Sequence, residues 1–212
     1  MLFCHMTSRV EGDAHPKLLS EKGGTGFPYL VFMDGAGNVL AKAGDRSVAG
    51  LQKTREACGA YLELEKKVKA GDKGAATDFL IARLEMGQLK FADTKQAVAD
   101  LGPVNAAQQK KIEGLVFGLE IQDMLSGLKS QEEANAAGRK FAAMMDEGRA
   151  PTGMVARQFY SLIASAAEAD KDAKTFEKAL KGLKEAVGDA PGSAKVFERM
   201  QQTLDKLKGE KK

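Results

Sequence analysis

Residues 26–42 read GFPYLVFMDGAGNVLAK, and this stretch decides how the first part of the chain folds. Tyr29 to Asp34 is a mostly apolar run of the length of a buried strand, and Val39 begins a second run that ends near residue 43. The Gly and Asn residues between the runs supply turn chemistry, so the pattern predicts a β-hairpin. Pro28 cannot donate a backbone hydrogen bond, and it therefore belongs at the first position of a strand.

The segments on either side of the hairpin have their own patterns. Residues 2–9 alternate as a strand, and residues 15–22 favour a short helix that Pro16 begins and Gly23 ends. Residues 48–70 carry apolar side chains at helical spacing and predict a long helix, in which Gly59 marks a kink or a close packing point.

This order of segments resembles the C-terminal half of a thioredoxin fold over roughly residues 2–60. The matching features are the Gly26-Phe27-Pro28 loop, the hairpin, the Gly44-Asp45 loop and the helix that follows. The resemblance implies that the Phe27–Pro28 peptide bond is cis. It also implies that Phe27 offers its backbone N–H and C=O to an extended peptide while Pro28 keeps the loop in shape. The alternative is that Pro28 only shapes the turn into a buried strand.

The other half of a thioredoxin fold, which holds the Cys-x-x-Cys motif, has no counterpart in these residues. Cys4 and Cys58 are the only cysteines, and they lie 54 residues apart (58 − 4), so we expect two small buried side chains and no thiol–disulfide exchange. Either residues 1–45 form a small three-stranded sheet, or the chain is an N-terminally shortened version of a longer protein, which is the reading we favour. In the second case an upstream segment would restore the redox activity.

After residue 70 the pattern becomes purely helical. Apolar residues recur at helical spacing between Gly and Pro breaks, in segments that we expect to form helices. These segments are 75–86, 91–101, 106–128, 131–146, 154–169, 172–187 and 194–207. Helix–turn–helix units of this kind are typical of a helical-hairpin array. Residues 82–87, with Phe91, Ala97 and Pro103, resemble a degenerate tetratricopeptide repeat.

Composition and charge exclude several classes of function. The net charge of +3 comes from 32 basic and 29 acidic residues mixed along the chain, and we expect the basic tail 206–212 to be solvated and not a nucleic-acid site. No apolar run reaches the roughly 20 residues of a membrane span. Cys4 and His5 are strand neighbours that point to opposite faces, so with His15 as the only other imidazole we expect no metal and no cofactor.

The sequence therefore predicts an α+β chain: a partial thioredoxin-like unit over residues 1–60 and an all-α helical-hairpin array over 61–212. We expect a non-catalytic protein-binding module that takes a protein or peptide partner through Phe27 and Pro28. The alternative is a thiol–disulfide oxidoreductase whose Cys-x-x-Cys half is missing.

Residues 1–7 lack the features of a signal peptide, so the chain as written is expected to be cytoplasmic, with export expected only if the true start lies upstream. The sequence does not set the oligomeric state.

Overall fold

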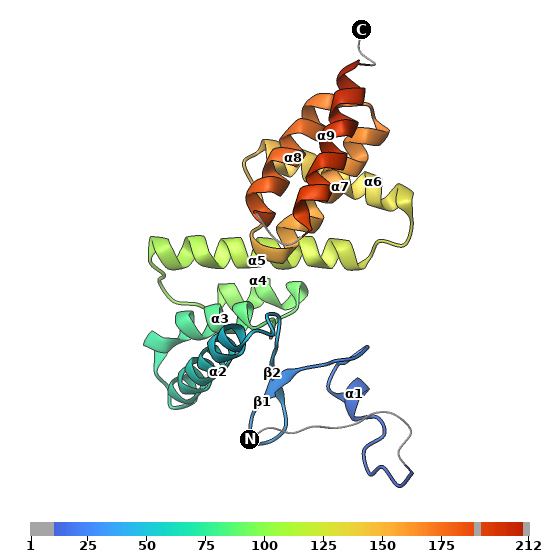
Figure 1. Cartoon of the computed structure of the whole chain (residues 1–212). Helices are drawn as coiled ribbons and strands as arrows, with labels where there is room; N and C mark the ends of the chain where they lie inside the picture. Colours follow the sequence, from blue (N-terminus) through green and yellow to red (C-terminus); the bar gives the residue numbers. More distant parts are fainter. Residues whose placement is uncertain (1–10, 189–191, 210–212) are drawn as a thin grey trace. The chain divides into compact units, whose positions relative to one another are not determined.

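The computed structural model describes residues 11–188 and 192–209, and in these residues the chain is mostly helical with one small antiparallel sheet (Figure 1). The elements in order are α1 Leu18–Glu21, β1 Val31–Met33, β2 Val39–Lys42, α2 Val48–Lys69, the 3-10 turn η1 Lys73–Ala75, α3 Ala76–Glu85, α4 Phe91–Ala99, α5 Ala106–Ser126, α6 Gln131–Asp146, α7 Gly153–Ala169, α8 Ala173–Val187 and α9 Ser193–Gly209. The coarse α+β expectation is confirmed. The expected strand at 2–9 lies outside the described residues.

The chain divides into two compact units between Gln108 and Gln109. This division differs from the expected boundary at residues 60 and 61, which lies inside α2. The physical reason is that α2 contacts the two strands of the hairpin and also packs against α3, so one continuous helix joins the sheet to the first helices of the array.

The hairpin in the first unit pairs Val31 with Lys42 and Phe32 with Ala41, with an irregularity between Phe32 and Met33. Its turn is organised by Asp34, whose carboxylate accepts hydrogen bonds from the backbone N–H of Ala36 (2.9 Å) and Asn38 (2.8 Å) and from the Asn38 side-chain amide (2.8 Å). These bonds lower the pKa of Asp34. The turn thus uses Asp34 in addition to the glycines and asparagine that the sequence pattern singled out.

A small core joins the hairpin to the helices of the first unit. Leu40, Cys58 and Tyr61 are buried together, and Phe32, Ala41, Leu62, Phe79, Ala82 and Met86 pack against them. The side-chain amide of Gln88 donates hydrogen bonds to the backbone carbonyls of Val39 (3.1 Å) and Leu40. The hairpin is therefore fixed to α2 and to the turn that follows α3.

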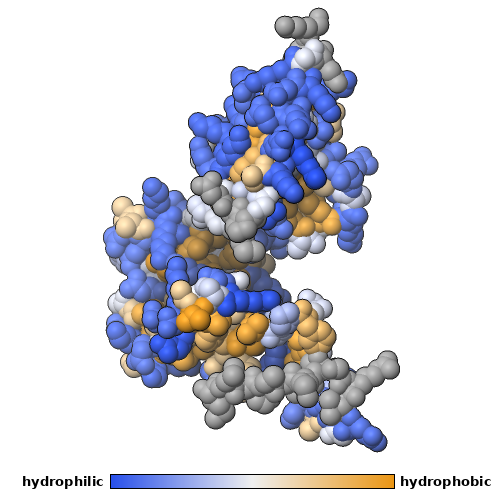
Figure 2. All heavy atoms as spheres, viewed as in Figure 1, coloured by the Kyte–Doolittle hydropathy of each residue, from blue (hydrophilic) through white to orange (hydrophobic). Residues whose placement is uncertain are grey.

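The second unit has the larger core, and its helices pack in chain order: α6 on α7, α7 on α8, and α8 on α9. Phe141 and Phe159 are fully buried, with stacked rings whose centroids lie 5.1 Å apart. Phe117 meets the Phe159 ring edge-on, and Arg149 lies over the Phe117 ring at 4.5 Å. The residues of this unit that are visible in Figure 2 are mostly hydrophilic, which matches helices that each bury one apolar stripe.

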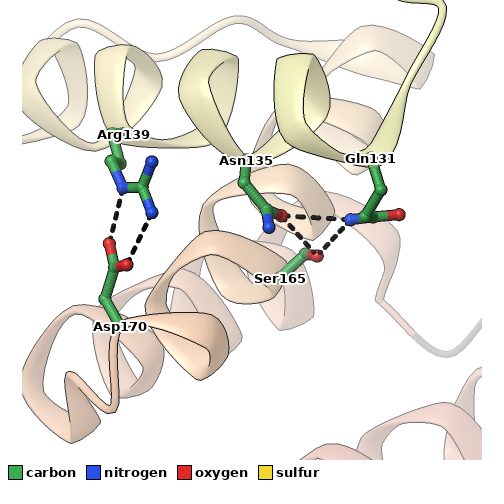
Figure 3. A network of polar contacts seen from close by, with 5 residues as sticks. All are labelled: Gln131, Asn135, Arg139, Ser165 and Asp170. Atoms are coloured by element: carbon green, nitrogen blue, oxygen red, sulfur yellow. Dashed lines mark hydrogen bonds and ion pairs between the residues drawn. The ribbon is translucent and has the colours of Figure 1, made fainter.

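Polar side chains also link α6 to α7 (Figure 3). Arg139 donates two hydrogen bonds to the carboxylate of Asp170, at 2.7 Å from Nε and 2.6 Å from Nη2. Ser165 donates to the side-chain oxygen of Asn135 (3.3 Å) and accepts from the side-chain amide of Gln131 (3.3 Å). These contacts join residues about 30 positions apart and fix how the two helices lie along each other.

Most expected helix boundaries agree with the structure, and the differences have local reasons. The helix expected at 15–22 is limited to Leu18–Glu21, with Pro16 before it and not in its first turn. The expectation that Gly59 is a close packing point is wrong, since a Cβ added there would meet no atom within 4 Å. The two-stranded sheet does not by itself establish a thioredoxin-like fold.

Candidate functional site

The loop that leads into β1 is held against α1. The Tyr29 hydroxyl donates to the backbone carbonyl of Lys22 at 2.6 Å. Gly24 is buried, and a Cβ added there would overlap the side chain of Leu19 and approach the ring of Tyr29 at 2.9 Å. A side chain at residue 24 would therefore require the side chains of Leu19 and Tyr29 to shift. The Phe27–Pro28 peptide bond is cis, as the resemblance to thioredoxin implies.

A second loop, residues 43–47, lies beside the first. The backbone N–H of Ala43 donates to the carbonyl of Leu30 at 3.0 Å, which extends the pairing of the hairpin. The guanidinium of Arg46 donates to the carbonyl of Pro28 at 3.1 Å, although the two residues are 18 positions apart. The Phe27–Pro28 loop is therefore held by contacts with α1 and with Arg46.

The next residues of the second loop cap helix α2. Ser47 is the N-cap, and its hydroxyl oxygen accepts a hydrogen bond from the backbone N–H of Gly50 at 3.0 Å. The Asp45 carboxylate accepts from the backbone N–H of Ser47 (2.8 Å) and from the Ser47 hydroxyl (3.0 Å), and these bonds lower the pKa of Asp45. The Asp45 side chain is thus directed to the helix, while Arg46 contacts the carbonyl of Pro28.

Exposed apolar side chains gather in this part of the chain. The large hydrophobic side chains that the described residues leave exposed are Phe27 (71%), Val48 (74%), Leu30 (40%), Met33 (37%) and Val196 (41%). All but Val196 fall within residues 27–48, and Figure 2 also shows apolar residues on the visible face of the first unit. Contiguous exposed apolar surface marks interaction sites, and these four exposed side chains make residues 27–48 the candidate segment for one.

The register of the hairpin also leaves main-chain groups at an edge. The C=O of Leu30 accepts a hydrogen bond from Ala43, and Phe32 pairs with Ala41 of β2. The alternation of an antiparallel pair therefore directs the N–H and C=O of Val31 away from β2. Val31 therefore lies on the outer edge of the sheet as far as the structure describes it. Main-chain groups of this kind can pair with an added strand.

Cys58 lies in the middle of α2, where it is 6% exposed and packs in the small core. Burial raises the pKa of its thiol, whereas an attacking thiol needs a lowered pKa and access to the substrate. The structure thus places Cys58 as the small buried side chain that the sequence predicts. Cys4 and His5 lie outside the described residues.

Residues 11–188 and 192–209 contain neither a cluster suited to a metal ion nor a helix suited to a membrane span. No group of three or more His, Cys, Asp and Glu side chains in these residues is arranged to hold a metal ion. In the same part of the chain, no helix combines the length and the apolar character that crossing a membrane requires.

Comparisons of this chain with protein-family models, with curated proteins and with solved structures found no match.

Sequence reasoning named Phe27 and Pro28 for this site but missed Arg46 and Val48. The structure brings Phe27 and Pro28 to the surface and adds Arg46 to Pro28 through a single long-range hydrogen bond. The sequence does show a basic residue, Arg46, directly after the Gly44-Asp45 loop. Its hydrogen-bond partner Pro28 lies 18 positions away, so the sequence around Arg46 does not indicate the contact. Val48 marked only the start of the expected helix, and its side chain lies exposed in the first turn of α2.

Proposed function

We propose that this chain is a protein-binding module that takes an extended segment of a partner at the Phe27–Pro28 loop and the adjoining edge of β1. In this proposal residues up to about 60 derive from a thioredoxin-like unit, and the helices that follow form a tetratricopeptide-like interaction domain. The observation that carries the proposal is the concentration of exposed apolar side chains at Phe27, Leu30, Met33 and Val48.

The proposed mode of binding is strand addition. An extended partner would pair its main chain with the outer edge near Val31, and its alternate side chains would contact apolar residues at the surface. The loop is held by Arg46 and by the Tyr29–Lys22 hydrogen bond before any partner arrives. A loop that is already ordered loses little conformational freedom on binding, which favours affinity.

The proposal includes no catalysis by the described residues. Cys58 is buried and its thiol pKa is raised, so it lacks the properties of a redox nucleophile. No observation favours the oxidoreductase alternative over binding.

The experiment starts from linear peptides selected from a library against the immobilised chain and measures their affinity by fluorescence anisotropy. Phe27→Ser should weaken binding about fivefold to thirtyfold, because an exposed aromatic anchor contributes on the order of 1–2 kcal/mol at an interface. Val196→Ser is the matched control, since Val196 is also exposed but lies in the second unit.

Circular dichroism should show that both variants keep the wild-type fold. Equal loss of affinity in Phe27→Ser and Val196→Ser, or a library that yields no binding peptide, would contradict the proposal.

A further inference from the structure

Basic side chains lie next to the residues that follow Phe27, and they indicate which chemical class of partner the site would bind. Arg46 contacts the carbonyl of Pro28, and the amino group of Lys42 lies 5.8 Å from the centre of the Tyr29 ring. Two basic side chains therefore contact the two residues that follow Phe27. The hydrogen bond to Pro28 uses one of the five N–H groups of a guanidinium, so Arg46 keeps donors for a further acceptor.

The one acidic residue in the same loop is engaged elsewhere. Both oxygens of the Asp45 carboxylate accept hydrogen bonds from Ser47, at the N-terminus of the 22-residue helix α2. A Cβ added to Gly50 would overlap the Asp45 carboxyl group, so the carboxylate also packs tightly on the first turn of that helix. The positive end of the helix dipole thus faces Asp45, while Arg46 is exposed beside the apolar surface.

We infer that the site selects an extended segment in which apolar side chains alternate with carboxylates. This inference rests on the proposed function and adds the chemical class of the partner. Phe27 and Val48 contact the apolar side chains, and Arg46 binds a carboxylate through donors that Pro28 leaves available. Guanidinium–carboxylate contacts are charge-assisted and directional, so they give selectivity in addition to affinity.

The test uses two fluorescein-labelled octapeptides with the full chain: one alternates Val with Glu, and the other alternates Val with Lys. The Val/Glu peptide should bind about tenfold more tightly, a difference that should shrink between about 20 mM and about 500 mM NaCl because screening weakens exposed charge pairs. Arg46→Gln should remove the preference, and Arg46→Lys should keep part of it because the charge remains. Arg55→Gln, which changes an exposed arginine farther along α2, should leave the preference unchanged.

Equal affinity for the two peptides would overturn this inference, and so would a preference for the Val/Glu peptide that survives Arg46→Gln. Neither result would contradict the proposed function. Absence of binding by both peptides also overturns it, while the proposed function is then judged by Phe27→Ser with the library-selected peptides. If Arg46→Gln loosens the loop, hydrogen exchange at residues 24–30 will be faster than in the wild type. In that case the Arg46→Lys variant decides, because a preference for the Val/Glu peptide that it retains must come from the positive charge.

Discussion

Gly138 of α6 packs directly against the backbone carbonyl of Leu162 in α7, so closely that a Cβ on Gly138 would overlap the carbonyl oxygen. The same Cβ would lie 2.8 Å from the Cβ of Ala166. Backbone atoms cannot move aside as a flexible side chain can. The two helices therefore pack this closely only because residue 138 has no side chain.

Gly138→Ala should destabilise the second unit by about 1–3 kcal/mol, because it overpacks a backbone contact between helices. Gly114→Ala is the matched control: Gly114 lies within α5, and a Cβ there meets no atom within 4 Å. That change should stabilise the chain by about 0.5–1 kcal/mol through helix propensity. Urea unfolding followed by circular dichroism compares the two, and effects of the same sign would contradict the packing argument.

The Arg139–Asp170 pair makes the stability of the second unit depend on pH. The hydrogen bond from Arg139 holds the pKa of Asp170 below its ordinary value of 3.8. A lowered folded-state pKa stabilises the fold above the unfolded-state pKa, and this contribution is lost as pH falls through the folded-state pKa. Both side chains are substantially exposed, at 54% and 40%, so the effect is small and screened by salt.

Asp170→Asn should therefore lower the melting temperature slightly at pH 7. The difference from wild type should shrink as pH falls through the lowered folded-state pKa of Asp170, because the wild-type carboxylate then becomes protonated as well. Asp123→Asn, at an exposed position on α5, serves as the control for loss of a surface carboxylate. Melting curves recorded by circular dichroism across this range test the prediction. A difference between wild type and Asp170→Asn that stays constant with pH would count against it.

Ser47→Ala should weaken the start of α2, because the Ser47 hydroxyl is the acceptor for the Gly50 N–H. Loss of such a cap costs about 1 kcal/mol, which corresponds to roughly fivefold faster hydrogen exchange at amides in the first turns of α2. Thr152→Ala is the control, since Thr152 is the N-cap of α7 but makes no side-chain cap hydrogen bond. Mass spectrometry measures hydrogen exchange in the first turns of both α2 and α7. Similar increases in the exchange rate in the two variants would refute a special role for Ser47.

Cys58 should react slowly with iodoacetamide in the folded protein, because its side chain is buried and its pKa is raised. In a Cys4→Ser background, where Cys58 is the only cysteine, alkylation at pH 8 should be on the order of a hundredfold slower in buffer than in concentrated urea. Intact-mass spectrometry follows the reaction. Equal rates in the two solvents would mean that Cys58 is accessible in the folded state.

The candidate site was only partly predictable from the sequence. Phe27 and Pro28 stand in a Gly-rich segment before an apolar run, and this local pattern sufficed to place them at the entrance to a strand. Arg46 contacts Pro28 from 18 residues away, and no local pattern encodes that contact. The exposure of Val48 likewise depends on what packs on the first turn of α2, which residue type alone does not reveal.

The sequence by itself determined where the helices and the hairpin lie, because those elements depend on neighbours a few positions apart: apolar residues at helical spacing, Gly and Pro at the breaks, and a turn rich in Gly and Asn. Only the tertiary structure decided which elements join. It placed the division of the chain at Gln108, since α2 packs on both the hairpin and α3, and it set Gly138 against the backbone of α7. Such contacts join residues far apart in the sequence, and their strength depends on shape and distance, which a local pattern does not contain.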